Sequence, residues 1–219
     1  LLNSGFGPVL MILGGVLSIF YADRIQSVAS QFIGMDIDIE LMLLILTGFL
    51  LSTVFTSAIS LSLEGKNLWV IRSLPIKAKT VVLSKSLFNV LLGAPVAVFF
   101  VGSVAFSLGV EFLTVLLMIL LVISFSLASS LIGSIINMYF PKFHYKNEAE
   151  VVKQSVGAFL GMFFGMGVIL IFGLLQGFLF SDLSLNLSLT IFLLIDVIIA
   201  ICFYILIDQK AESLFMKYS

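Results

Sequence analysis

Few residues of this chain could carry out covalent chemistry. It has one histidine, His144, and one cysteine, Cys202, so neither a thiolate metal cluster nor an intrachain disulfide can form. The sequence contains no HExxH pair for a zinc protease and no GxxxxGK(S/T) loop for binding ATP. We therefore predict that the chain is not an enzyme and has neither a cofactor nor a metal of its own.

Asp196 has the most functional potential, because its carboxyl lies near the centre of a long apolar run, LLIDVII. A carboxyl there costs about 2.5–3.5 kcal/mol on insertion scales, which the surrounding apolar residues offset. It could be a proton or cation site, or it could face the bundle interior and hydrogen-bond to a serine or threonine. We favour the second interpretation, because no other ionisable residue lies in mid-membrane. Gln176 is a further polar residue that we expect to face protein or a cavity.

The composition indicates which elements position these side chains. Hydrophobic residues make up 61% of the chain, charged residues only 11%, and the mean hydropathy is +1.25. A soluble domain has about a quarter of its residues charged. We predict an all-α, polytopic integral membrane protein that forms a single transmembrane domain over residues 1–219. Its six expected spans, each of roughly the length that crosses a bilayer, lie near residues 5–21, 41–63, 86–109, 112–136, 157–180 and 187–207.

Basic residues fall in alternate segments between these spans. Segments 64–85 and 140–156 and the C-terminal tail hold ten of the eleven lysines and arginines. The segments between them hold only Arg24. The positive-inside rule therefore places the basic segments and both termini in the cytoplasm. Because the chain begins with Leu1 rather than methionine, we expect it to be part of a longer protein.

The fifth apolar run carries small residues at four-residue spacing. Small residues on one helix face permit close approach of another helix, so packing is a better explanation than a ligand site. The packing partner is either the same chain or a second protomer, and the sequence does not separate these two. The residues are Gly157, Gly161, Gly165, Gly173 and Gly177.

The cytoplasmic segment 62–86, SLEGKNLWVIRSLPIKAKTVVLSKS, contains a short amphipathic pattern. Leu68, Trp69 and Ile71, followed by Leu74, give an apolar side, and Pro75 ends the helix. Such a helix can rest in the lipid interface or dock in a groove on a cytoplasmic partner. On these physical grounds alone the interface is slightly favoured.

The same segment resembles the permeases of type-2 ABC exporters. The motif is a glutamate–glycine pair after the second span, a short helix, Leu-Pro, and a lysine that enters the third span. The matching residues are Glu64, Gly65, Leu74, Pro75 and Lys85. Together with FPKFHYKNEAEVVKQS at 140–155, the motif is most similar to a group of large bacterial ABC permeases. This chain is shorter than those permeases and lacks a large extracellular domain.

The resemblance implies that segment 64–75 is a coupling helix that contacts a separate cytoplasmic ABC ATPase subunit. It also implies a bacterial plasma membrane and a second permease half or a homodimer. Beyond these proteins and the lipid bilayer, we expect no nucleic-acid partner. The alternatives are an ion-coupled secondary transporter that uses Asp196, and a membrane scaffold with no transport role.

The second basic segment supports a partner at this face. Pro141 ends the fourth helix, and Asn147 with Glu150 has the pattern of a capping box. We expect the fifth helix to begin near Glu148 in the cytoplasm and to run into the membrane near Gly157. Glu148 and Glu150 would then face a partner, although an ordinary solvated helix end explains them equally well.

Overall fold

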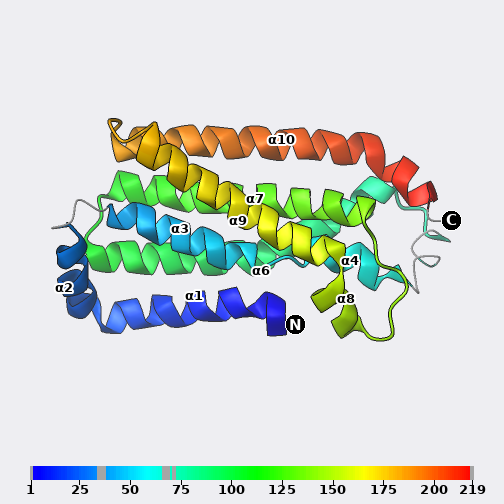
Figure 1. The fold of residues 1–219 in the computed structure, drawn as a ribbon, viewed down its shortest axis with the longest axis horizontal. Helices are drawn as coiled ribbons and strands as arrows, with labels where there is room; N and C mark the ends of the chain where they lie inside the picture. The colour runs from blue at the N-terminus through cyan, green and yellow to red at the C-terminus, as the bar shows by residue number, and fades with distance from the viewer. Residues whose placement is uncertain (1, 34–37, 66–69, 71–72, 218–219) are drawn as a thin grey trace.

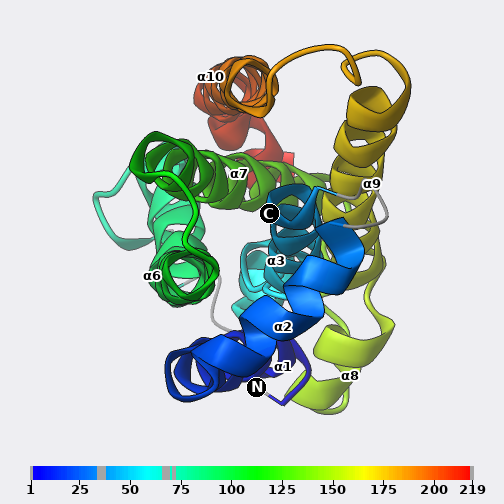
Figure 2. The same cartoon turned by 90° about the vertical axis from the view of Figure 1, so that its left-hand side faces the viewer.

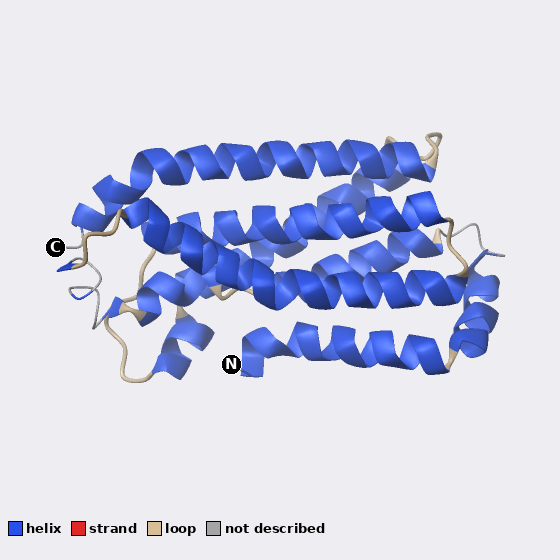
Figure 3. Ribbon diagram, turned by 180° about the vertical axis from the view of Figure 1, so that it is seen from behind, coloured by secondary structure: helices blue, strands red, loops and turns tan. Residues whose placement is uncertain are grey.

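The computed structural model describes residues 2–33, 38–65, 70 and 73–217, and within these ranges it contains helices but no strand (Figures 1 and 3). Long apolar runs without water-facing charge favour helices, because a helix satisfies its own backbone hydrogen bonds inside a bilayer. In chain order the helices are α1 (Leu2–Phe20), α2 (Ala22–Ile33), α3 (Ile39–Ser52), α4 (Ser57–Leu63), α6 (Ala78–Leu108), α7 (Phe112–Tyr139), α8 (Glu148–Gln154), α9 (Val156–Phe178) and α10 (Leu185–Lys217).

Five stretches of the described chain are long and apolar enough to cross a membrane: α3 with α4, then α6, α7, α9 and α10. A sixth crossing is obtained if α1 and α2 count as one span, but this pair bends by 98° where the helices meet. Figure 2 shows α2 lying across one end of the bundle. The prediction of an all-α polytopic membrane protein with about six spans is confirmed.

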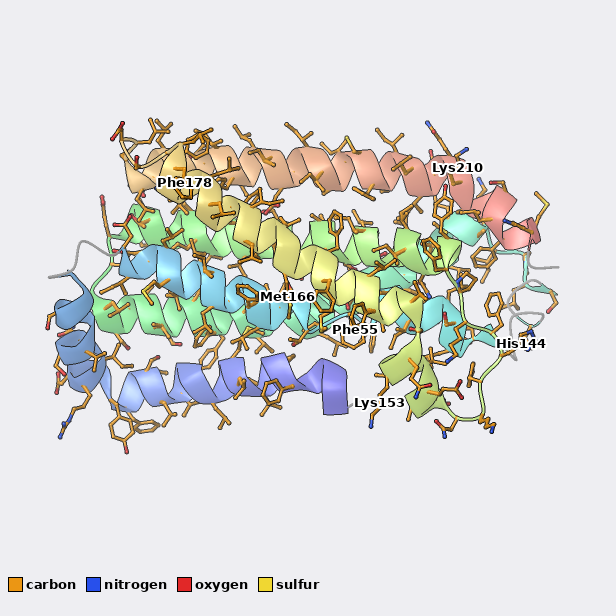
Figure 4. All side chains as sticks on the ribbon, in the orientation of Figure 1. Phe55, His144, Lys153, Met166, Phe178 and Lys210 are labelled. Atoms are coloured by element: carbon orange, nitrogen blue, oxygen red, sulfur yellow. The ribbon has the colours of Figure 1, made fainter. Side chains whose placement is uncertain are left out.

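The connections gather at two ends of the bundle (Figure 1). One end, which we call the basic end, holds the end of α4, segment 73–77, segment 140–155 and the last turns of α10. The opposite end holds α2 and the short connections at 109–111 and 179–184. In Figure 4, His144 and Lys210 lie at the basic end and Phe178 lies at the opposite end. The segments that carry most of the basic residues are therefore neighbours in space.

Two spans are longer than predicted. Helix α6 begins at Ala78 rather than near residue 86, and α10 continues to Lys217 rather than ending near 207. Polar contacts between the two extensions explain the difference. Lys79 Nζ lies 2.7 Å from Asp208 Oδ1, and the Glu212 carboxylate accepts a hydrogen bond of 2.9 Å from the N–H of Ala78. These extensions therefore carry their own charges beyond the apolar runs.

The second predicted span, 41–63, corresponds to α3 with α4, although residues 53–56 interrupt the helix between them. The prediction that the fifth span continues from the helix begun near Glu148 is wrong. Ser155 is extended between α8 and α9, with φ −85° and ψ 141°, and its side chain accepts a hydrogen bond from the N–H of Ala158. Serine is a favoured residue at such a helix start.

Helix α7 occupies the middle of the bundle, where α4, α6, α9 and α10 pack around it (Figure 2). Its buried apolar side chains join two cores, one that includes Phe125 and Phe192 and one at the basic end that includes Ile135 and Ile207. Its buried polar side chains are Thr114, Ser124, Ser126, Ser130, Ser134 and Asn137. The central helix thus contributes six buried polar side chains to the interior of the bundle.

Candidate functional site

Asn137 on α7 is fully buried and organises the basic end. Its Oδ1 accepts hydrogen bonds from the backbone N–H groups of Leu61 (2.7 Å) and Ser62 (3.2 Å), and its Nδ2 donates to Ser62 Oγ at 2.7 Å. The same Ser62 hydroxyl accepts a hydrogen bond of 3.0 Å from the N–H of Lys142. One amide therefore ties the last turn of α4 to α7 and to the segment that follows α7.

Asn89 on α6 holds the other end of α4. Its Oδ1 accepts hydrogen bonds from Thr56 Oγ1 at 2.6 Å and from the N–H of Ser57 at 3.3 Å. The first N–H groups of a helix have no partner within the helix, so this amide supplies one. Sequence reasoning missed Asn89 and Asn137. Their signal was a lone amide within an apolar run, LFNVLL and IINMYF, where polar side chains face protein rather than lipid.

The glutamate and lysine of the permease-like motif are partners in the structure. Glu64, at the end of α4, forms an ion pair with Lys85 on α6, and both side chains are partly buried. The adjacent Gly65 leaves room for Phe143, because a Cβ at position 65 would lie 2.8 Å from Phe143 Cδ1 and 3.1 Å from its Cα. A side chain at position 65 would therefore push the second basic segment away from α4.

Further contacts join the end of α4 to the second basic segment. The hydroxyl of Tyr145 donates a hydrogen bond of 2.9 Å to the carbonyl of Leu63. With the Lys142–Ser62 hydrogen bond and the Gly65–Phe143 contact, this makes one continuous surface. We call it the platform and define it as residues 61–65 with residues 140–150.

The predicted coupling helix is described only in part. Leu68, Trp69 and Ile71 lie outside the described residues. Leu74 and Pro75 lie on the surface at the start of the connection to α6. Their predicted contact with a partner stays a prediction.

Glu148 and Glu150 differ in their surroundings. The predicted N-cap is confirmed, since the Asn147 side chain accepts a hydrogen bond of 3.0 Å from the N–H of Glu150, whereas the reciprocal bond of a capping box comes from the N–H of Lys146 rather than that of Asn147. The Glu150 carboxylate pairs with Lys142 Nζ at 2.8 Å and accepts a hydrogen bond from the N–H of Lys146. The hydrogen bond from Lys142, followed by that from Lys146, lowers the pKa of Glu150 below its usual value. Glu150 is thus engaged within the platform, whereas Glu148 is exposed.

The glycine face of α9 packs mainly within the chain. A Cβ at Gly157 would lie 2.5 Å from the carbonyl oxygen of Ala58, and one at Gly161 would lie 2.6 Å from the Cβ of Ala58. Gly165 contacts Ser52 in the same way, and Gly173 faces Ile45. Among the described residues, nothing lies within 4 Å of a Cβ at Gly177. Four of the five predicted packing glycines therefore fit α9 against α3 and α4.

The two intramembrane polar residues face the interior of the bundle. Asp196 is 1% exposed, and Ser124 Oγ lies 3.4 Å from its Oδ2. Gln176 is buried and donates a hydrogen bond of 3.5 Å to the carbonyl of Phe180. Within the described ranges, no group of three or more His, Cys, Asp or Glu side chains could hold a metal ion.

A helical bundle with five or six membrane crossings and buried polar side chains along its central helix defines a polytopic α-helical membrane protein. A model of the family described as "Membrane protein of 12 TMs" matches residues 6–209, and the chain belongs to this family. Comparison with curated proteins and with solved structures gives no match. The family description states neither a substrate nor a partner.

Proposed function

We propose that this chain is the transmembrane subunit of an ATP-driven, ABC-type exporter, coupled through the platform and segment 64–75 to a separate cytoplasmic ATPase. The observation that carries the proposal is that the end of α4, where segment 64–75 begins, is joined to the second basic segment through Ser62, Gly65 and Tyr145. ATP hydrolysis is assigned to the partner, because the chain contains no P-loop sequence.

The platform has the connections that a coupling surface needs. A displacement at the end of α4 reaches α6 through the Glu64–Lys85 ion pair and α7 through Asn137. Asn89 connects the start of α4 to α6 as well. Coupling between distant sites requires packed and hydrogen-bonded elements that move together. Binding or release of a partner at the platform would therefore act on two central spans at once.

The surface beside the platform has the character of a docking site. Val70, Leu74 and Ile76 are 40%, 47% and 48% exposed, and the exposed Lys77 follows them directly. Apolar side chains next to a lysine match a partner groove with an apolar floor and an acidic rim. Because Glu64 and Lys85 belong to the motif that resembles ABC permeases, we assign the partner that carries this groove as an ABC ATPase.

The family description supports a larger assembly. It names twelve transmembrane segments, whereas the described part of this chain supplies five or six. We propose that a second half of similar size completes the unit in the bilayer, either as another copy of this chain or as a further permease half. By the resemblance, the assembly lies in a bacterial plasma membrane.

The test uses variants of the surface that leave the membrane spans intact. Leu74→Asp and Trp69→Ala are expected to weaken co-purification of the ATPase, because truncating an interface anchor costs about 2 kcal/mol or more, which is roughly a thirtyfold loss of affinity. Leu179→Asp is the matched control, since Leu179 is exposed at the opposite end of the bundle.

Abundance and membrane insertion should stay normal in all three variants. Full ATPase association in both Leu74→Asp and Trp69→Ala would show that the coupling assignment is wrong. Transport that needs a proton gradient and no ATPase would instead favour the ion-coupled secondary transporter.

A further inference from the structure

A partly open cavity of about 40 Å³ lies inside the bundle, between α3, α7, α9 and α10. Its walls are apolar and include the rings of Phe125, Phe172 and Phe192. Among the described residues that line it, Asp196 alone has a polar side chain. The cavity is therefore an apolar space with one carboxyl at its wall.

The Asp196 carboxyl is incompletely satisfied. Its Oδ2 lies 3.4 Å from Ser124 Oγ, which is at the long limit of a hydrogen bond, and the Ser124 hydroxyl also donates to the carbonyl of Leu121 at 2.9 Å. Its Oδ1 is buried and has no hydrogen-bond partner within the described ranges. Buried polar atoms are nearly always paired, so an unpaired carboxyl oxygen at a cavity points to a missing donor.

The chemistry of the cavity restricts what that donor can be. An inorganic cation such as Ca²⁺ or Mg²⁺ requires six or more oxygen ligands, and this cavity offers one carboxylate beside a distant hydroxyl. An ammonium group requires only a counter-ion and hydrogen-bond acceptors. The apolar walls suit the tail that such an amine carries.

The size of the cavity restricts the donor further. A group the size of a water molecule needs about 10–15 Å³ of cavity volume. The cavity of about 40 Å³ therefore holds roughly three groups of that size. A primary ammonium with one or two carbons fits, and its tail would leave through the open side. A trimethylated ammonium presents a bulkier head and fits less well.

We propose that this cavity binds the ammonium end of an apolar primary amine, with Asp196 as its counter-ion and Phe125, Phe172 and Phe192 around its first carbons. The binding event requires neither ATP nor a partner protein. As a substrate site for export, the cavity rests on the function proposed above.

The test is equilibrium binding of tritiated octylamine to the purified full chain in lipid nanodiscs, without ATPase, with empty nanodiscs subtracted for partitioning into lipid. Octanol has the same tail and no charge, and octyltrimethylammonium has the charge on a bulkier head. Asp196→Asn is the site variant, and Asp182→Asn, an exposed aspartate in the short connection before α10, is its matched control.

The wild type and Asp182→Asn are expected to bind octylamine at least about tenfold more tightly than they bind octanol or octyltrimethylammonium. Asp196→Asn is expected to lose that preference while keeping its expression level and thermal stability. Equal binding of octylamine and octanol by the wild type would overturn the proposal, even if Asp196→Asn failed to fold. Unchanged octylamine binding in Asp196→Asn would overturn it as well. Because no ATPase is present, either failure leaves the coupling proposal to its own test.

Discussion

Two buried amides, Asn89 and Asn137, determine how the basic end is built. Each accepts hydrogen bonds from polar groups at one end of α4, and each lies on a different neighbouring helix. In a low-dielectric interior an unpaired N–H costs about 1–3 kcal/mol, so the short α4 depends on these two side chains. An apolar residue at position 89 would leave the N–H of Ser57 without this acceptor, and one at position 137 would remove the side-chain bonds to Leu61 and Ser62.

Replacing Asn137 with alanine is expected to destabilise the protein. The change removes the three side-chain hydrogen bonds that Asn137 makes with the N–H groups of Leu61 and Ser62 and with the Ser62 hydroxyl, at a cost of about 2–3 kcal/mol. For a chain of this size, that lowers the Tm by roughly 5–10 °C. Asn186→Ala is the control, because the Asn186 side chain accepts one hydrogen bond, from Thr114, in a partly exposed position. Thermal unfolding in detergent measures both, and equal Tm values would contradict the role of Asn137.

Glu150 predicts a pH dependence that is confined to the platform. Because Lys142 and the N–H of Lys146 lower the pKa of Glu150 in the fold, the stabilisation is fully present above its ordinary value of 4.5. It is lost as the pH falls below 4.5 and through the lowered pKa of the folded state. The rate of backbone amide hydrogen exchange in α8, corrected for the intrinsic rate at each pH, should therefore rise when the pH is lowered from 6 to 3.

The matched variants for this measurement are Glu150→Gln and Glu148→Gln. Glu150→Gln should give fast exchange in α8 at both pH values, because the carboxylate is gone. Glu148→Gln should behave like the wild type, since Glu148 is exposed and outside the capping box. Identical exchange in α8 at pH 6 and pH 3 in the wild type would rule out this contribution.

At the scale of the elements, the interrupted span α3–α4 and the glycine face of α9 belong together. Gly157 and Gly161 lie against Ala58, and Gly165 lies against Ser52, which is the last residue of α3. Small residues on both sides allow the helices to approach closely, as is common between membrane helices. The glycine face therefore positions α9 against the end of α3 and the start of α4.

Gly161→Ala is expected to destabilise this contact, and Gly177→Ala is not. A Cβ at position 161 would lie 2.6 Å from the Cβ of Ala58, so α9 would have to shift, at a cost of about 1–3 kcal/mol. A Cβ at position 177 meets no described atom within 4 Å, and alanine is the better helix former. Thermal unfolding should show a lower Tm for Gly161→Ala alone. Equal losses for both would mean that the close approach does not matter.

Hydrophobic runs predicted the long helices well but not their interruptions. The break at residues 53–56 occurs within an apolar run, and Asn89, far along the chain, satisfies the groups that it leaves free. The break at Ser155 likewise follows a short helix, α8, whose Glu150 forms an ion pair with Lys142 earlier in the chain. A pattern along one segment carries no information about partners on another, so these features required the three-dimensional arrangement.

The candidate site was predictable in its residue types and not in its pairing. The motif residues Glu64 and Lys85 were identified from the sequence, but their ion pair was not. The N-cap of Asn147 was predicted correctly, because its partner Glu150 is close in sequence. The contact between Gly65 and Phe143 joins two segments far apart in the sequence, so no local pattern predicted it.

For the whole molecule, one arrangement accounts for both charge and structure. Ten of the eleven basic residues belong to segments assigned to one side, and the described parts of those segments meet at the basic end (Figure 1). Short segments rich in lysine and arginine stay in the cytoplasm. The central claim is therefore that the platform faces the cytoplasm, since a cytoplasmic ATPase could not reach it otherwise.

The most direct test of this claim is thiol labelling of intact spheroplasts with a membrane-impermeant maleimide. The background is Cys202→Ser, which removes the one native cysteine, and single cysteines replace Asp182 or Lys77. Both positions are exposed, at opposite ends of the bundle. We expect Asp182→Cys to be labelled in intact spheroplasts and Lys77→Cys only after the membrane is permeabilised. Labelling of Lys77→Cys in intact spheroplasts, with protection of Asp182→Cys, would contradict the account.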